Sequence, residues 1–136
     1  LSNIGAKTIF VEKYPWVIKG DFWKYRNRKN ITYKEYRALK KGLTLAAHIA
    51  PEVYTSRNVS YKNEKFDNIP IIGTTEEYAA TSSLYPETGR FLTALDVHSN
   101  RRVCVLGNEV VERLFSKENP LGRRIRIGVE QYQVIG

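Results

Sequence analysis

The 136-residue sequence contains no methionine and a single cysteine. Because a natural chain starts with methionine and no signal peptide is visible, we expect a piece excised from a longer protein, with any targeting or membrane segment upstream of Leu1. The lone Cys104 excludes an internal disulfide. It lies inside an apolar run, which predicts a buried and unreactive side chain.

Long apolar segments are also missing, since no run approaches the ~18–20 residues that span a bilayer. Hydrophobic residues make up 42% and charged residues 26% of the chain, values typical of folded globular domains. The length predicts one domain over residues 1–136, or two small lobes that share a core.

Sequence motifs for catalysis and for metal binding are absent. His48 and His98 are fifty residues apart, whereas metal ligands cluster at short spacing. No G-x-S-x-G elbow and no glycine-rich phosphate loop occurs. We therefore predict no enzyme activity, no metal and no cofactor.

The net charge of +8 is concentrated in one stretch. Between Lys19 and Lys41 there are nine basic residues against Asp21 and Glu35. Aromatic side chains are interleaved with these cations, a combination that suits nucleic-acid phosphates and bases or anionic lipid headgroups. The candidate partner or lipid surface comprises Phe22, Trp23, Tyr25, Arg26, Arg28 and Lys29.

The hydrophobic and turn patterns predict an α+β fold with mostly antiparallel sheets and a few short helices. Thr32 and Glu35 match a capping box that begins a helix, with Gly42 as its C-terminal cap. A second helix starts near Thr75, and Asn108 caps a third. We expect a basic loop at residues 19–31 and strands at residues 7–13, 53–61, 66–73, 103–106 (buried on both faces), 124–127 and 132–135.

Short motifs over nearly the whole chain resemble, in their order, the periplasmic core domain of MacB-type ABC transporter permeases, which are related to FtsX, LolC and LolE. The most specific ones lie in the second half of the chain: Gly89-Arg90-Phe91 with Asp96, Leu106-Gly107 with Glu109, Leu114-Phe115, Pro120-Leu121-Gly122 and Val134-Ile135-Gly136. The basic, aromatic stretch 19–30 departs from the family pattern.

This resemblance implies a porter-like lobe and a smaller second lobe, with the returning strands outside the present piece. It also implies a location on the extracytoplasmic, periplasmic side of the bacterial cytoplasmic membrane, as part of a membrane protein. ATP would be hydrolysed in a separate cytoplasmic domain or subunit and coupled mechanically to export or extraction of a peptide, drug, toxin or lipoprotein. The implied partners are a permease homodimer or heterodimer, that ATP-binding part, and a periplasmic adaptor or lipoprotein, but no nucleic acid.

The motif residues are expected to have structural roles. Gly89 and Gly107 would permit backbone turns, Arg90 would anchor a loop, and residues 120–122 would fix a turn. Two other interpretations of the chain remain: a small nucleic-acid-binding module that uses the stretch from Lys19 to Lys41, and an adhesion or assembly domain on the cell surface.

Overall fold

The computed structural model describes residues 8–14 and 23–136. The chain divides into two compact units, Leu1–Ile49 and Ala50–Gly136, which we call the N-terminal and the C-terminal unit.

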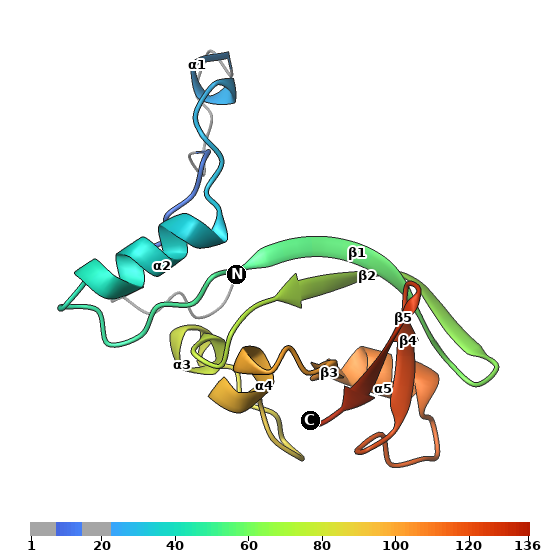
Figure 1. The fold of residues 1–136 in the computed structure, drawn as a ribbon. Coiled ribbons are helices and arrows are strands. Elements are labelled where there is room, and N and C mark those ends of the chain that lie inside the picture. The colour runs from blue at the N-terminus through green and yellow to red at the C-terminus, as the bar shows by residue number, and fades with distance from the viewer. Residues whose placement is uncertain (1–7, 15–22) are drawn as a thin grey trace. The chain divides into compact units, whose positions relative to one another are not determined.

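The N-terminal unit contains helix α2 (Tyr33–Gly42), preceded by the short helix α1 (Trp23–Arg26) (Figure 1). The predicted capping box of α2 is confirmed. The backbone N–H of Thr32 donates to Glu35 Oε2 at 2.9 Å, and the Thr32 hydroxyl accepts from the backbone N–H of Lys34 at 3.3 Å. The helix ends at Gly42 with Leu43 as its C-cap, one residue later than predicted.

Two predictions for the N-terminal unit are wrong. Residues 8–13 form no strand, and Lys7 lies outside the described residues. A strand needs a neighbour for its backbone hydrogen bonds, and none of the described residues pairs with this segment. The expected loop at 19–31 contains α1 at its centre, whereas its first residues, 19–22, lie outside the described part of the chain.

The C-terminal unit is organised around one curled sheet, which confirms the α+β class (Figure 1). Its strands are β1 (Val53–Tyr61), β2 (Glu64–Gly73), β3 (Val103–Cys104), β4 (Arg124–Ile127) and β5 (Glu130–Val134). The order across the sheet is β2-β1-β4-β5-β3. All neighbours are antiparallel except β3 and β5, so the prediction of a mostly antiparallel arrangement is confirmed.

The hairpin of β1 and β2 carries a bulge. The pairing register shifts between Arg57 and Val59, and the side-chain Oδ1 of Asn58 accepts the backbone N–H of Asn68 at 3.0 Å. Asn68 has a φ of 55°, a left-handed conformation that asparagine tolerates. Because a bulge adds local twist, the long hairpin curves instead of lying flat (Figure 1).

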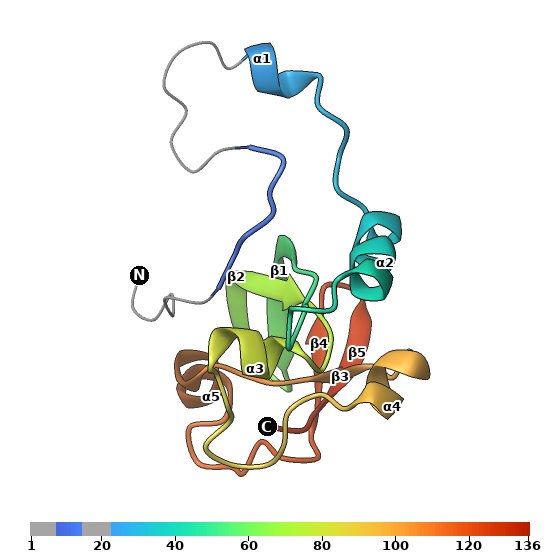
Figure 2. The same cartoon turned by 90° about the vertical axis from the view of Figure 1, so that its left-hand side faces the viewer.

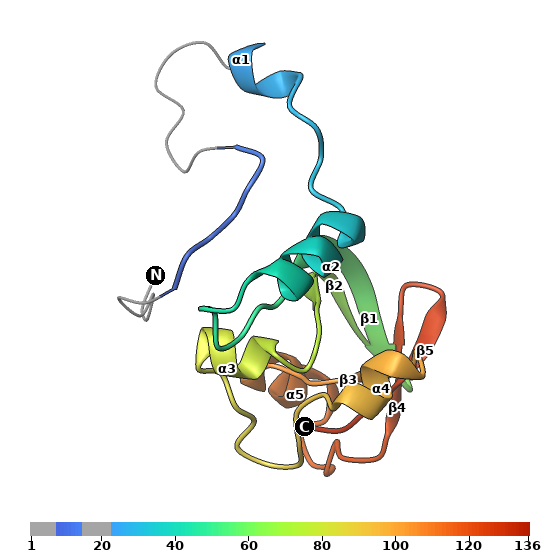
Figure 3. The same cartoon turned by 60° about the vertical axis from the view of Figure 1, so that its left-hand side comes forward.

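Strand β3 is shorter and less buried than predicted. Of the expected strand at residues 103–106, only Val103 and Cys104 are assigned to the sheet, and both are half-buried. The reason is its position at the edge of the sheet, where, among the described residues, β3 pairs only with β5. In Figure 3 this short strand lies between α5 and α4. Hydrogen bonds to the last residues continue nonetheless, since Ile135 donates to Cys104 O and Leu106 donates to Gly136 O, both at 3.0 Å.

The core lies between the sheet and helix α5 (Asn108–Leu114). Helices α3 (Tyr78–Ser82), α4 (Ala94–His98) and α5 all lie below the β1–β2 hairpin in two views (Figures 1 and 2). The Tyr61 and Phe115 rings approach to 4.3 Å between centroids. The buried core residues are Val59, Ile69, Leu114, Phe115, Ile125 and Val134.

Two predicted helix starts are displaced. Asn108 is the first residue of α5, and the N-cap is Gly107, which offers no side-chain hydrogen bond to the helix. Helix α3 begins at Tyr78 after the N-cap Glu77, three residues beyond the predicted start at Thr75. Neither helix has a side-chain hydrogen bond at its N-cap, so the residue types at these positions do not fix where the first turn begins.

Candidate functional site

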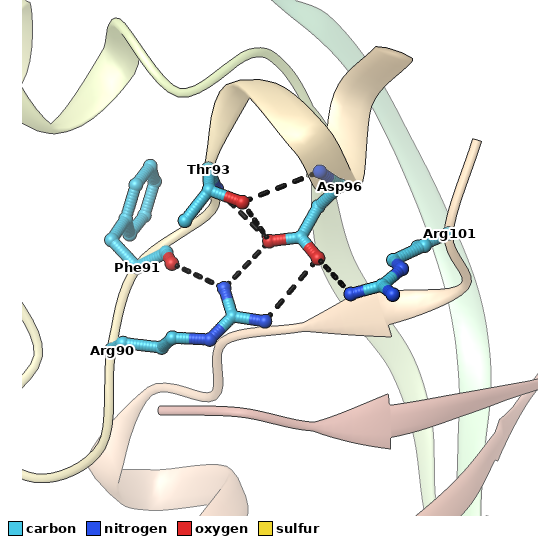
Figure 4. Close-up of polar contacts among 5 residues, drawn as sticks. All are labelled: Arg90, Phe91, Thr93, Asp96 and Arg101. Atoms are coloured by element: carbon cyan, nitrogen blue, oxygen red, sulfur yellow. Dashed lines mark hydrogen bonds and ion pairs between the residues drawn. The ribbon is translucent and has the colours of Figure 1, made fainter. Parts of the chain in front are cut away.

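The motif residues Arg90 and Asp96 meet at the start of α4 (Figure 4). Thr93, the N-cap, donates to Asp96 Oδ2 from its backbone N–H at 3.0 Å and from its hydroxyl at 2.8 Å. The Arg90 guanidinium forms a bidentate pair, with Nη1 2.6 Å from Oδ2 and Nη2 3.2 Å from Oδ1. Arg101 Nη1 lies 3.5 Å from Oδ1. We call these four residues the Asp96 cluster.

The carboxylate of the Asp96 cluster is fully enclosed. Asp96 is 1% exposed, whereas the two arginines are about half exposed. The Arg90 guanidinium, helped by Thr93, holds the pKa of Asp96 well below its usual range, and the carboxylate in turn raises the pKa of Arg90. Because donors already occupy both oxygens, Asp96 acts as an anchor and is unsuited to be a general base.

Three motifs that are far apart in sequence interlock next to this cluster. The backbone N–H of Arg90 donates to Ile135 O at 2.8 Å, and Leu106 donates to Gly136 O at 3.0 Å. Gly89 has a φ of +77°, and a Cβ there would lie 2.3 Å from Ile135 O. The last residues of the chain are therefore held between the 89–90 loop and Leu106. We call these five residues the C-terminal junction.

The turn at residues 120–122 joins the same region. Gly122 donates its backbone N–H to Val134 O at 2.8 Å, and Leu121 donates to Asn119 Oδ1 at 3.0 Å. Pro120 and Leu121 are half-buried. The turn thus ties the start of β4 to the end of β5.

The aromatic and aliphatic motif residues pack internally. Leu114 and Phe115 belong to the core. Phe91 stacks on Tyr78 of α3 with ring centroids 6.3 Å apart. These contacts connect the 89–91 loop to α3 and α5 to the sheet.

Two motif residues do not join these clusters. Gly107 and Glu109 are both exposed at the start of α5. The expected need for glycine at position 107 is wrong, because its φ of −73° is open to any residue and nothing lies near the position of a Cβ.

The basic, aromatic residues lie in the N-terminal unit. The Arg28 guanidinium sits over the Tyr25 ring at 4.7 Å, and Lys29 Nζ is 3.1 Å from Glu35 Oε1. Of the remaining residues of the expected surface, Trp23 and Arg26 belong to α1, and Phe22 lies outside the described residues.

Few side chains in the described part of the chain have reactive chemistry. Burial raises the pKa of the Cys104 thiol to about 12, so the thiol stays protonated at neutral pH. Across residues 8–14 and 23–136, no group of three or more metal-ligating side chains comes together. A half-open hollow of about 240 Å³ lies beside Tyr61 and Lys62, where both side chains are already bonded to Glu118.

Within the same described residues, no helix is both long and apolar enough to cross a bilayer. The described residues thus contain three notable features: the enclosed Asp96 cluster, the C-terminal junction and the basic residues of the N-terminal unit.

Two solved structures show the class of protein to which this fold corresponds. The periplasmic region of MacB from Actinobacillus actinomycetemcomitans has a TM-score of 0.72 and 26% identity, covering 86% of this chain and 55% of that one. The extracellular domain of the noncanonic ABC-type transporter YknZ from Gram-positive bacteria also has a TM-score of 0.72, at 27% identity, covering 78% and 56%. The fold is thus that of extracytoplasmic domains of ABC-type transporters.

The whole sequence, residues 1–136, matches the family described as MacB-like periplasmic core domain. Similar proteins include the macrolide export ATP-binding/permease proteins MacB of Aggregatibacter actinomycetemcomitans (27% identity over 111 residues) and of Neisseria meningitidis (28% over 136 residues). The chain belongs to the MacB-like periplasmic core domain family, the extracytoplasmic domains of MacB-like ABC transporter permeases.

These curated relatives are much longer than the present chain. The matches cover 82% and 100% of this chain but only 17% and 20% of the two relatives. Because the matched region is the periplasmic domain of a permease, the family indicates a non-catalytic domain with an extracytoplasmic location.

The sequence patterns did not reveal two members of the Asp96 cluster, Thr93 and Arg101. No helix was predicted at residues 94–98, although Thr93 and Asp96 have the capping-box spacing from which α4 could have been predicted. Arg101 has no local signal, because only the return of the chain after α4 brings its guanidinium to the carboxylate.

Proposed function

We propose that this chain is the stiff extracytoplasmic lobe of a bacterial permease that couples cytoplasmic ATP hydrolysis mechanically to export or extraction of a substrate. Residues 1–136 would form one core-domain fragment, with a porter-like part and a smaller lobe. The chain itself would not be catalytic. The observation that carries the proposal is the C-terminal junction together with the Asp96 cluster.

A lobe that transmits force must keep its shape when its base moves. The Asp96 cluster joins Arg90, in the loop before α4, to Arg101, three residues after the end of the helix. The C-terminal junction then fastens that loop to Ile135 and Gly136, which directly follow β5. These links support a rigid body in which Ile135 and Gly136 are firmly attached to the core.

The permease would act with partners that this chain does not contain. We propose a homodimer or heterodimer of permeases, a cytoplasmic ATP-binding domain or subunit, and a periplasmic adaptor or lipoprotein. The proposed substrate is a peptide, a drug, a toxin or a lipoprotein. Because the relatives are named macrolide export proteins, a macrolide is the first substrate to test.

The test uses the full permease carrying Asp96→Asn. The neutral amide loses the charge-assisted bonds to two guanidinium groups, which should cost about 1–3 kcal/mol of folding free energy. We expect macrolide export to fall while the membrane content of the permease and its ATP hydrolysis are maintained. The reason is that the destabilised lobe deforms when force is transmitted through it.

The matched control is Asp67→Asn, since Asp67 is an exposed aspartate on β2. It should leave both export and ATP hydrolysis unchanged. Full export by the Asp96→Asn permease, with the destabilisation verified on the domain, would contradict the mechanical role.

A further inference from the structure

Helix α2 carries three cations along one face. Lys34, Arg37 and Lys41 are spaced i, i+3 and i+7, which places them in one stripe on an α-helix. All three are exposed, whereas Tyr36 and Leu39 on another face are buried and half-buried. We call Lys34, Arg37 and Lys41 the cationic stripe.

The rules of helix stability explain Lys41, which lies in the last turn where the helix dipole favours a cation, but they do not explain Lys34 and Arg37. Lys34 lies in the first turn, where the helix dipole disfavours positive charge. Like charges one turn apart also destabilise a helix. Within the described part of the chain, no ion pair neutralises any of the three residues. Lys34 and Arg37 therefore do not stabilise α2, which points to a role outside folding.

Exposed apolar side chains accompany these charges. Tyr33, one turn before Arg37, is 59% exposed, and Leu45 just beyond the helix is 98% exposed. Ile31 and Leu43 are also exposed. Tyrosine and aliphatic side chains beside a basic helix face are typical of segments that lie at a membrane surface.

The surrounding residues strengthen the positive field. From residue 23 to residue 49 there are eight lysines and arginines and one acidic residue, Glu35. That single carboxylate is already bonded to Thr32 and Lys29. The field over this segment is therefore strongly positive, and a partner must be anionic.

We propose that the cationic stripe and its exposed apolar neighbours bind the anionic phospholipid headgroups of the membrane to which the permease belongs. Basic side chains would meet lipid phosphates, and Tyr33 and Leu45 would enter the headgroup region. This surface adds a direct membrane contact to the mechanical role proposed above. It depends on the family only for the extracytoplasmic location.

An anionic bilayer fits this surface better than a nucleic acid does. Aliphatic side chains such as Leu45 gain from insertion between lipids but offer no stacking surface to bases. The extracytoplasmic location of the family also separates the chain from cellular RNA and DNA.

The test is vesicle co-sedimentation of the 136-residue chain. We expect binding to vesicles of phosphatidylcholine with phosphatidylglycerol, weaker binding at raised salt, and little binding to pure phosphatidylcholine. The triple variant Lys34→Gln, Arg37→Gln, Lys41→Gln should lose on the order of 100-fold in affinity for the anionic vesicles, since each cation contributes about 5-fold.

Glutamine has nearly the helix propensity of lysine and arginine, so circular dichroism should show α2 intact. A charge-conserving variant, Lys34→Arg with Lys41→Arg, should bind like the native chain. The matched control removes three exposed cations of the other unit: Lys65→Gln, Arg124→Gln and Arg126→Gln.

Three outcomes would overturn the proposal. One is equal binding to neutral and anionic vesicles, and another is an equal loss of affinity in the control variant. The third is tighter binding to a single-stranded oligonucleotide than to the anionic vesicles at the same salt, which would favour a nucleic-acid surface. None of these results depends on transport activity, so failure here leaves the mechanical proposal standing.

Discussion

Two glycines with nearly the same backbone conformation have very different surroundings. Gly89 has a φ of +77° and Gly122 a φ of +78°. A Cβ at position 89 would meet Ile135 O at 2.3 Å and a Leu121 methyl at 2.7 Å, whereas nothing lies within 4 Å of a Cβ at position 122. Position 122 therefore requires glycine only for its backbone conformation, whereas position 89 requires it for the conformation and for lack of space.

We predict that Gly122→Ala costs about 1–2 kcal/mol, because a left-handed residue with a Cβ is strained. Gly89→Ala should cost roughly 1–3 kcal/mol more, since the methyl group also displaces the chain end from the C-terminal junction. Urea unfolding of the two variants measures the difference. Equal costs would show that Ile135 and Gly136 are not held against Gly89.

At the scale of an element, α2 is defined by local bonds. Glu35 accepts from the Thr32 backbone and lies beside Lys29. The Thr32 hydroxyl bond, reinforced by Lys29, lowers the pKa of Glu35 from 4.5 to about 2. The folded-state pKa is thus below the unfolded value, so the carboxylate supports the helix above pH 4.5 and this support disappears as the pH falls toward 2.

We predict that the helical chemical shifts of α2 stay constant at neutral and mildly acidic pH and decline between pH 4.5 and pH 2. Glu35→Gln should abolish this titration, because the amide keeps a hydrogen-bond acceptor but has no charge to lose. Glu109→Gln is the matched control, since Glu109 lies in the first turn of α5 without a capping bond. A decline that persists in Glu35→Gln would assign the effect to another carboxyl.

At the scale of the whole molecule, the C-terminal unit has one small core. It is formed by the inner face of the curled sheet and by the end of α5. Ile125 on β4 is 1% exposed and pairs with Tyr132 on β5, while Val129 at the tip of the same hairpin is 88% exposed. The stability of the sheet should therefore depend on the first residue and not on the second.

We predict that Ile125→Ala lowers the free energy of unfolding by about 2–5 kcal/mol, because it leaves a cavity where the sheet meets α5. Val129→Ala should change it by less than about 0.5 kcal/mol. Chemical denaturation followed by far-UV circular dichroism measures the free energy of unfolding of both variants. A similar loss in the two variants would mean that the hairpin tip is packed as well.

Much of the sheet could be predicted because its signals are local. Alternating side chains define β1, and Arg124 to Ile127 precede a tight turn that leads into β5. The prediction of a strand at residues 7–13 was wrong because a strand also needs a partner that is distant in sequence. Apolar residues such as Ile9 and Phe10 favour a strand, but no described neighbour offers it backbone hydrogen bonds.

The order of motifs along the chain was enough to indicate the family, and the Thr32–Glu35 spacing was enough to place α2, because both are properties of consecutive residues. The parallel pairing of β3 with β5 and the meeting of Asp96 with Arg90 and Arg101 were decided only in the folded chain. Those contacts depend on how segments that are distant in sequence pack against one another. The spacing of residues along the chain does not show which of these segments come together.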